Sequence, residues 1–301
     1  MELIDLGDSP SRGDGRKAKT GDAASFLKPI IVSVVFSAIF TFLTINAIYV
    51  APIEFVPESQ GGIAAAAVNA IILSMLPFIG ALILLVILRN KKKLLLKAFI
   101  GVGFLLAGFT IFSIILASAL MVAFATLQAG TAFLIAIPVS LALNIIFVVV
   151  ILSTRAPQAA KNIAAVTYGG GIGTLLGTAL PLWTGLLMVM GISIYDIYSV
   201  RSGPIKEIVK VSKEQQEVIP GLSYMTSDWE IGLGDLGIYS MLVSLAETQF
   251  GPIACIASIL GVVIGSLLTL QLLKKREFLP GLPITSLIGA IPIVIYMILS
   301  I

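Results

Sequence analysis

Two stretches of sequence decide the fold: PLWTGLLMVMGISIYDIYSV (residues 181–200) and IGLGDLGIYSMLVSLAETQ (residues 231–249). Both have the apolar composition of membrane helices, and each carries one aspartate, Asp196 and Asp235. A carboxylate inside a membrane costs about 2.5–3.5 kcal/mol on insertion scales and indicates a functional site by default. Two such carboxylates at matched depth suggest acid–base chemistry on water.

The overall composition is that of a multi-pass membrane protein. The chain has 301 residues, of which 58% are hydrophobic and only 12% are charged, and its mean hydropathy is +1.07. These values exclude an ordinary soluble domain. The net charge of +3 does not call for a nucleic-acid partner. We therefore expect an all-α membrane protein whose surroundings are the lipid bilayer.

Several catalytic chemistries are excluded by the residue counts. The chain has no histidine, which removes Ser-His triads, Cys-His dyads and His-ligated zinc. Its single cysteine, Cys255, lies in an apolar stretch and is read as a small packing residue. We expect no metal site and no cofactor.

The apolar runs predict nine membrane-spanning helices. Residues 1–26 read as a flexible cytoplasmic tail without a short apolar core, so no secretory signal peptide is expected. Residues 201–230 form a polar loop between spans six and seven, which divides the membrane domain into residues 27–200 and 231–301. The predicted spans are 27–50, 63–88, 98–126, 131–152, 160–179, 181–200, 231–249, 251–273 and 283–301.

The basic residues predict the orientation of the chain. With nine alternating spans, all 19 Lys and Arg residues fall on the same side of the membrane. The loops on the other side carry Glu54, Glu58 and Glu247 but no basic residue. The positive-inside rule then puts the N-terminus in the cytoplasm and the C-terminus outside.

Topology also predicts where the two aspartates lie. Each is four residues from the cytoplasmic end of its predicted span, which places both carboxylates roughly 6 Å below that boundary. Two facing carboxylates cannot both ionise cheaply, so the pair would share one proton near neutral pH. The ionised partner could then take a proton from water while the other donates one to a carbonyl oxygen.

Small residues suggest how the helices approach one another. Gly169, Gly173 and Gly177 repeat every four residues in the fifth span, and Ala257, Gly261 and Gly265 do so in the eighth. This spacing is typical of closely packed membrane helices. Gly232 and Gly234 would let another backbone come close to Asp235 or would adopt unusual dihedral angles. 

Tyrosines flank the first aspartate. Tyr195 could bond a carboxylate or cover the pocket with its ring, or it could belong with Tyr198 to an interfacial aromatic belt. For Tyr198 the belt is favoured. Taken alone, the two aspartates leave proteolysis, a proton or ion path and a structural pair open.

Three motifs together resemble a known family. These are Tyr195-Asp196, Gly232-Leu233-Gly234-Asp235 and Pro280-Gly281-Leu282-Pro283. They resemble the motifs of the presenilin and signal peptide peptidase family of GxGD intramembrane aspartyl proteases. The third motif departs from the family's Pro-Ala-Leu by having Gly281 in place of alanine.

The presenilin branch is the better match. Tyr239-Ser240-Met241-Leu242-Val243 looks like the presenilin Tyr-Ser-x-Leu-Val stretch. The 201–230 loop is much shorter than in animal presenilins, so the chain looks like a microbial, archaeal homologue in the cell membrane of a prokaryote. The short loop leaves self-cleavage undecided.

The resemblance implies an endopeptidase that cuts single-span helical substrates inside the bilayer. It makes Asp196 and Asp235 the catalytic pair in a water-activating, metal-free mechanism. It makes Tyr195, Gly232, Leu233 and Gly234 active-site support. Pro280, Gly281, Leu282 and Pro283 would position an unwound substrate. A homo-oligomer and additional partner subunits stay open.

Two other functions compete with this reading. A prepilin-type peptidase also uses Gly-x-Gly-Asp, but the Tyr-Asp and Pro-Gly-Leu-Pro motifs argue against it. A proton-coupled transporter or cation leak channel could use the same buried carboxylates. Transporters often contain inverted repeats with interrupted helices at the membrane midplane, and no convincing internal repeat is present here.

Overall fold

The computed structural model describes residues 4–5, 22–48, 50–202, 221–226, 228–273 and 281–299. Within these ranges the chain forms nine long helices and three short strands. The helices are α1 (Ala23–Ala47), α2 (Glu58–Arg89), α3 (Lys93–Ala123), α4 (Ala129–Leu152), α5 (Gln158–Ala179), α6 (Leu182–Ser202), α8 (Leu233–Phe250), α9 (Pro252–Leu273) and α10 (Leu282–Leu299). The strands are β1 (Ile4–Asp5), β2 (Ser223–Met225) and β3 (Trp229–Gly232).

Each of the nine predicted spans corresponds to one of these helices. Seven of the described helices are long and apolar enough to cross a membrane. The other two are α5 and α8. Both are rich in glycine or hydroxyl residues, and both lie in the interior of the bundle, where they need little apolar surface for lipid.

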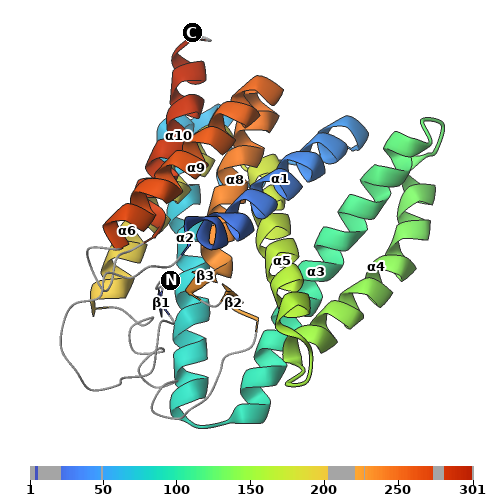
Figure 1. Ribbon diagram of the computed structural model, residues 1–301. Coiled ribbons are helices and arrows are strands. Elements are labelled where there is room, and N and C mark those ends of the chain that lie inside the picture. Colours follow the sequence, from blue (N-terminus) through green and yellow to red (C-terminus); the bar gives the residue numbers. More distant parts are fainter. Residues whose placement is uncertain are drawn as a thin grey trace.

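Helix α8 is the central element of the bundle. Every residue from Asp235 to Glu247 is buried. Helices α1, α5, α9 and α10 pack around it, and α1 runs diagonally across α5 and α8 (Figure 1). The helix ends where Gly251 adopts φ 84° and donates its N–H to the carbonyl of Glu247 over 2.8 Å, and Pro252 begins α9. Asp235 therefore lies in the first turn of the most enclosed helix.

The glycine repeat of α5, predicted to be a packing face, packs against the backbone of α8. A Cβ added at Gly169 would lie 3.0 Å from the carbonyl oxygen of Leu233, and one at Gly177 would lie 2.5 Å from that of Met241. At Gly173 it would overlap the carbonyl oxygen of Gly237. The two helices therefore touch backbone to backbone along this face, and any larger side chain would push α8 away.

Buried hydroxyl groups tie α1 and α5 to the same face of α8. Ser33 and Ser240 share a hydrogen bond of 2.9 Å, and Thr41 donates to Ser244 over 2.8 Å. Thr174 of α5 donates to Ser37 of α1 over 2.8 Å. Because the partners pair with one another, these polar groups stay satisfied without water inside the bundle.

The second predicted small-residue face joins α9 to α10. A Cβ at Gly261 would lie 2.7 Å from the carbonyl oxygen of Ile288, and one at Gly265 would lie 2.6 Å from the Cα of Thr285. Ser258 also donates to the carbonyl of Gly289 over 2.9 Å. Helix α10 is thus held by α9 in the way that α8 is held by α5.

The start of α6 is capped by a residue from another helix. Glu58, in the first turn of α2, accepts hydrogen bonds from the N–H and the hydroxyl of Thr184. The segment that leads into α2 is fixed by Asn69, whose side chain forms hydrogen bonds with the backbone of Phe55 and Val56. A carboxylate at a helix N-terminus satisfies free N–H groups and complements the helix dipole. These contacts set the position of α6, which carries Asp196.

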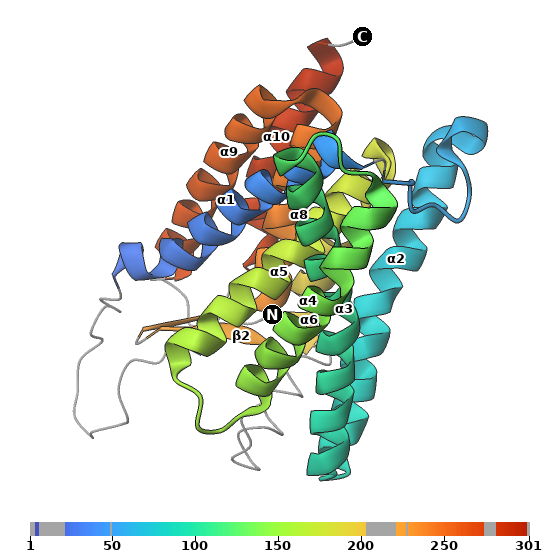
Figure 2. The same ribbon diagram turned by 90° about the vertical axis from the view of Figure 1, so that its right-hand side faces the viewer.

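The remaining helices lie at the edges of the bundle. Helices α3 and α4 form a hairpin that stands at one side (Figure 1). In the perpendicular view α2 stands beside α3, at the edge opposite α9 and α10 (Figure 2). Many large apolar side chains on these helices are exposed, as expected for surfaces that meet lipid.

Part of the predicted 201–230 loop belongs to a small antiparallel sheet, which also includes β1 from the N-terminal segment. Its strand order is β1-β3-β2, so β3 has a neighbour on each side. Strand β3 leads directly into α8, which begins at Leu233 rather than at the predicted residue 231. An apolar-run search cannot find strands this short, since each has only two to four residues.

The expectation that Glu247 lies in a loop is wrong. Glu247 lies in the last turns of α8 and is only 5% exposed. The thiol of Cys255 donates to its carboxylate over 3.4 Å. Cys255 is buried, as expected for a packing residue, but it also provides a polar partner.

The α5–α8 contact yields a stability prediction. Gly173→Ala should lower the free energy of unfolding by about 1–3 kcal/mol, because the added methyl group overlaps the backbone of α8. Gly103→Ala in α3 is the matched control, since a Cβ there meets nothing within 4 Å. Thermal unfolding in detergent should show a lower midpoint for the first variant alone. Equal midpoints would mean that α5 and α8 are not in close contact.

Candidate active site

Asp196 lies on α6 and is 2% exposed. Its Oδ2 accepts a hydrogen bond from the backbone N–H of Leu282 over 3.3 Å. Leu282 is the first residue of α10, so the carboxylate faces the positive end of that helix. The free N–H groups and the dipole at a helix N-terminus both favour an anion.

Asp235 lies in the first turn of α8 and is 1% exposed. Neither of its carboxylate oxygens has a hydrogen bond of normal geometry within the described part of the chain, and the backbone of Gly232 contributes a weaker interaction. Asp235 is within electrostatic range of Asp196. The two aspartates therefore come together in one buried region, as predicted from topology, and each is close to a helix N-terminus.

Tyr239 connects Asp235's helix to the start of α10. Its hydroxyl donates to the carbonyl of Gly281 over 3.2 Å and also interacts with the side chain of Thr285. Both aspartates are within electrostatic range of this hydroxyl. Apart from its family motif, the only sequence signal for Tyr239 is its spacing of four residues from Asp235, which puts both on one helix face.

The Pro-Gly-Leu-Pro motif lies beside the aspartates where the structure describes it. Gly281 and Leu282 are buried and Pro283 is half-buried, at the start of α10. Pro280 lies outside the described residues. Thr285 pairs with Thr269 of α9 over 3.1 Å, and Ser286 pairs with Ser193 of α6 over 2.8 Å. The start of α10 is therefore fixed from three sides.

The two tyrosines near Asp196 have different surroundings. The ring of Tyr195 packs edge-on against Phe78 of α2, with ring centroids 5.6 Å apart. Its hydroxyl oxygen is buried and interacts with the side chain of Ser199, one turn along α6. Tyr198 is 57% exposed, which fits the interfacial ring predicted for it.

The residues before Asp235 differ in what they contact. Gly232 precedes α8 in an extended conformation, and the N–H of Leu233 donates to the carbonyl of Leu222 over 2.9 Å. Gly234 is exposed, has no positive φ, and would place a Cβ in open space. Neither reason predicted for Gly234 is found within the described structure. Instead, no described atom lies within 4 Å of the position that a Cβ of Gly234 would take, so the backbone next to Asp235 is exposed there.

The comparisons with known proteins point to the same family as the three motifs. No family model matches the chain. Presenilin-B of Dictyostelium discoideum is 36% identical over 121 residues, which cover 37% of this chain. The match spans only a quarter (25%) of that relative's length. The chain is presenilin-like in sequence.

Solved structures extend the likeness to the fold of the presenilin-like chain. The structure of a presenilin family intramembrane aspartate protease in space group P2 superposes with a TM-score of 0.63 and 18% identity, over 92% of this chain and 98% of that one. A second structure, in space group C222, gives a TM-score of 0.61 and 19% identity over 91% and 98%. Together with its seven apolar helices, this fold makes the chain a multi-pass membrane protein.

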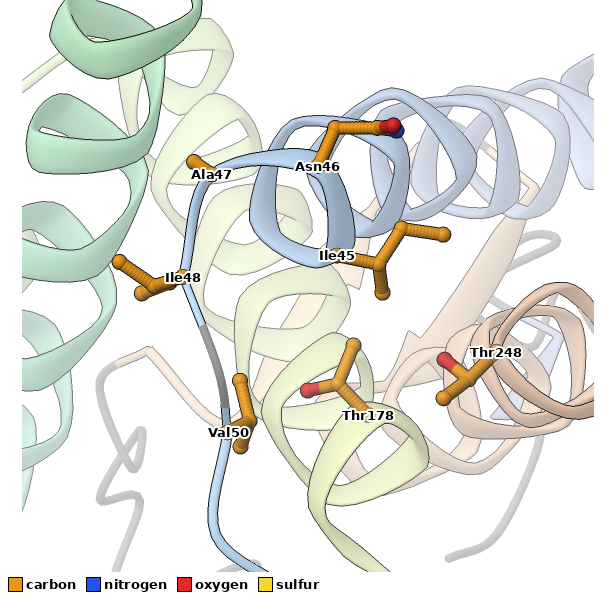
Figure 3. Close-up of a pocket in the computed structure, with 7 residues that line it drawn as sticks. All are labelled: Ile45, Asn46, Ala47, Ile48, Val50, Thr178 and Thr248. Atoms are coloured by element: carbon orange, nitrogen blue, oxygen red, sulfur yellow. The ribbon is translucent and has the colours of Figure 1, made fainter.

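A separate pocket of about 480 Å³ lies far from the aspartates of this presenilin-like chain. It is lined by the end of α1, by Thr178 of α5 and by Thr248 of α8 (Figure 3). Thr248 is thirteen residues after Asp235, which is about 20 Å along the helix. The pocket therefore opens at the other end of α8 and has no share in the candidate site.

The hydrogen bond from Tyr239 to the carbonyl of Gly281 can be tested by removing one oxygen atom. Tyr239→Phe should lower the free energy of unfolding by about 0.5–1.5 kcal/mol, because the buried carbonyl of Gly281 loses its donor. Tyr198→Phe is the control, since that side chain is exposed. Thermal unfolding measures both. A Tyr239→Phe protein as stable as the control would show that the bridge does not hold α10.

Proposed function

We propose that this chain is an intramembrane aspartyl endopeptidase that hydrolyses peptide bonds of single-span membrane substrates. The observation that carries the proposal is the pair of buried aspartates, on adjacent helices of a membrane bundle and each beside a helix N-terminus. The name of the solved structures that share this fold, intramembrane aspartate protease, supports it.

In the proposed mechanism the two carboxylates act as one acid–base pair. The ionised aspartate accepts a proton from a water molecule, which attacks the scissile carbonyl. The protonated aspartate donates a hydrogen bond, and then its proton, to the carbonyl oxygen, which gives a tetrahedral intermediate. The C–N bond of this intermediate then breaks, the leaving nitrogen takes the proton that the first aspartate accepted from water, and a hydroxyl of the intermediate returns a proton to the second aspartate. The products are a carboxylic acid and an amine. Neither a covalent intermediate nor a metal ion is needed. The backbone N–H of Leu282 donates a hydrogen bond to the carboxylate of Asp196 and so helps to fix its position.

The substrate must unwind before it can be cut. A helical peptide bond is already hydrogen-bonded, and inside a bilayer the freed backbone groups need new partners. The uncovered backbone at Gly234 lies directly beside Asp235 and offers one place where an unwound strand could approach. Pro280, Gly281, Leu282 and Pro283 would position it from the other side, while Tyr195, Gly232 and Leu233 support the site.

Several finer features belong to the same proposal. Nine crossings would put the N-terminus in the cytoplasm and the C-terminus outside, in the cell membrane of a prokaryote. The single-side distribution of all 19 basic residues supports this orientation. The tail 1–26, the membrane segments 27–200 and 231–301, and the loop 201–230 would then form a single membrane domain with its site at the cytoplasmic side. Substrates would be transmembrane helical peptides.

Removal of either carboxylate is the primary test. Asp196→Asn and Asp235→Asn should each abolish cleavage of a single-span peptide by the purified protein in lipid vesicles, because one carboxylate alone cannot act as both acid and base. Glu247→Gln is the matched control: it neutralises a third buried acid, on the same helix as Asp235. This control should cleave at the parent rate.

The same vesicles separate the competing functions. If proton or sodium flux accompanies the parent protein and is lost in both aspartate variants, while no peptide is cut, a transporter or channel is the better account. Cleavage that survives either substitution would remove the two-aspartate mechanism.

Gly234 provides a test of substrate approach. Gly234→Val should leave the melting temperature close to that of the parent, because its side chain enters open space. It should lower kcat/KM by about tenfold or more if an unwound substrate passes there, since small displacements of a reacting bond cost rate steeply. Unchanged kcat/KM would place the substrate on another side of Asp235.

A further inference from the structure

The short sheet places the N-terminus of the chain next to the candidate active site. Strand β3 has β2 on one side and β1, residues Ile4 and Asp5, on the other. In the antiparallel pairing Ile4 is opposite Glu230 and Asp5 is opposite Trp229. Figure 1 shows the three strands together beneath the start of α8. The edge that β1 covers is thus four to six residues from Gly234 and Asp235 in sequence.

Strand β3 is itself held firmly. Trp229 and Ile231 are each 1% exposed, and Trp229 packs edge-on against Phe26 of α1 with ring centroids 5.4 Å apart. On its other side β3 pairs with β2, and the Leu233–Leu222 hydrogen bond continues that ladder into α8. The edge facing β1 is therefore a rigid row of backbone groups that ends at the candidate site.

Such an edge suits an extended peptide. Strand addition supplies partners to backbone groups that have left a helix, and it requires no particular side chains. Among the described strands, β3 is the one continuous with the helix of Asp235, so a peptide paired with it would run toward that carboxylate. The N-terminal strand and an unwound substrate need the same row of donors and acceptors.

We propose that β1 is a built-in competitor that occupies the β3 edge and must leave before a substrate strand can pair there. This inference rests on the proposed function. The pairing is short, only two residues, so the competitor is displaceable. Sixteen residues separate Asp5 from Asp22 at the start of α1, so the strand is tethered near its edge at high effective concentration.

Backbone variants test the competition through KM. Ile4→Pro with Asp5→Pro removes both N–H donors and prevents strand pairing, whereas Ile4→Ala with Asp5→Ala keeps the backbone intact. The proline pair should lower KM by about three- to tenfold at unchanged kcat, because apparent affinity scales with the fraction of free edges. The alanine pair should keep the parent KM. Equal KM in both pairs, or a higher KM with proline, would overturn the proposal.

A disulfide tests the pairing without relying on cleavage. Ile4→Cys with Glu230→Cys, in a Cys255→Ala background, puts two thiols at opposed positions of the pair. Oxidation should form the cross-link readily and block cleavage. Reduction of the disulfide should restore cleavage. Failure to cross-link, or a cross-linked protein that still cleaves at the reduced rate, would contradict the proposal.

Substrate binding can be followed in a protein that cannot cut. In the Asp235→Asn form of the two-cysteine protein, a saturating single-span peptide should slow cross-link formation several-fold. Cross-linking at an unchanged rate, with peptide binding verified by co-purification, would overturn the competition but leave the proposed protease intact. Absence of peptide binding together with an inactive parent would instead count against the proposed function.

Discussion

The contact between the backbones of α5 and α8 is the constraint on which the site depends. Gly169, Gly173 and Gly177 leave no side chains between the two helices, so α8 lies directly against α5 along three turns. Inside a bilayer there is no hydrophobic drive to bring such helices together, and close packing with buried hydrogen bonds replaces it. The paired hydroxyls of Ser33, Ser240 and their neighbours supply those bonds.

The consequence for chemistry is that two carboxylates can be held in the interior of an apolar bundle. Asp235 begins α8, and Asp196 faces the beginning of α10, so each carboxylate is next to the positive end of a helix. Tyr239 joins the two helix starts through the carbonyl of Gly281. The second close contact, at Gly261 and Gly265, fixes α10 against α9. The glycine face of α5 thus positions α8 with Asp235, and the glycine face of α9 positions the start of α10 beside Asp196.

Much of this arrangement could be predicted from sequence because hydrophobic runs, glycine spacing and motif residues carry it. The nine apolar segments, the α5 and α9 packing faces and the layer shared by the aspartates follow from period and topology. Helices α5 and α8 are less apolar than the others because they are buried within the bundle. A hydropathy pattern cannot distinguish such a buried helix from a segment that inserts poorly into a membrane.

The parts that could not be predicted depend on contacts between distant segments. Glu247 is buried because α9 brings Cys255 to it, eight residues later. Gly234 faces open space and has no positive φ, whereas the sequence suggested that another backbone comes close or that the dihedral angles are unusual. The β1–β3 pair joins residues more than 220 positions apart, and two residues leave no alternating pattern to detect. Tyr239 becomes part of the site only once α10 is placed against α8.

We propose that the enclosed aspartate pair cuts peptides within the membrane, beside the sheet and the start of α8. The most direct measurement is the mass of the products formed from a single-span peptide in vesicles, which identifies the bond that is cut. We predict a bond inside the apolar segment, about one helical turn from its boundary, and no products from the Asp235→Asn protein. Cuts confined to the polar flanks of the peptide, or identical products from Asp235→Asn, would contradict the account.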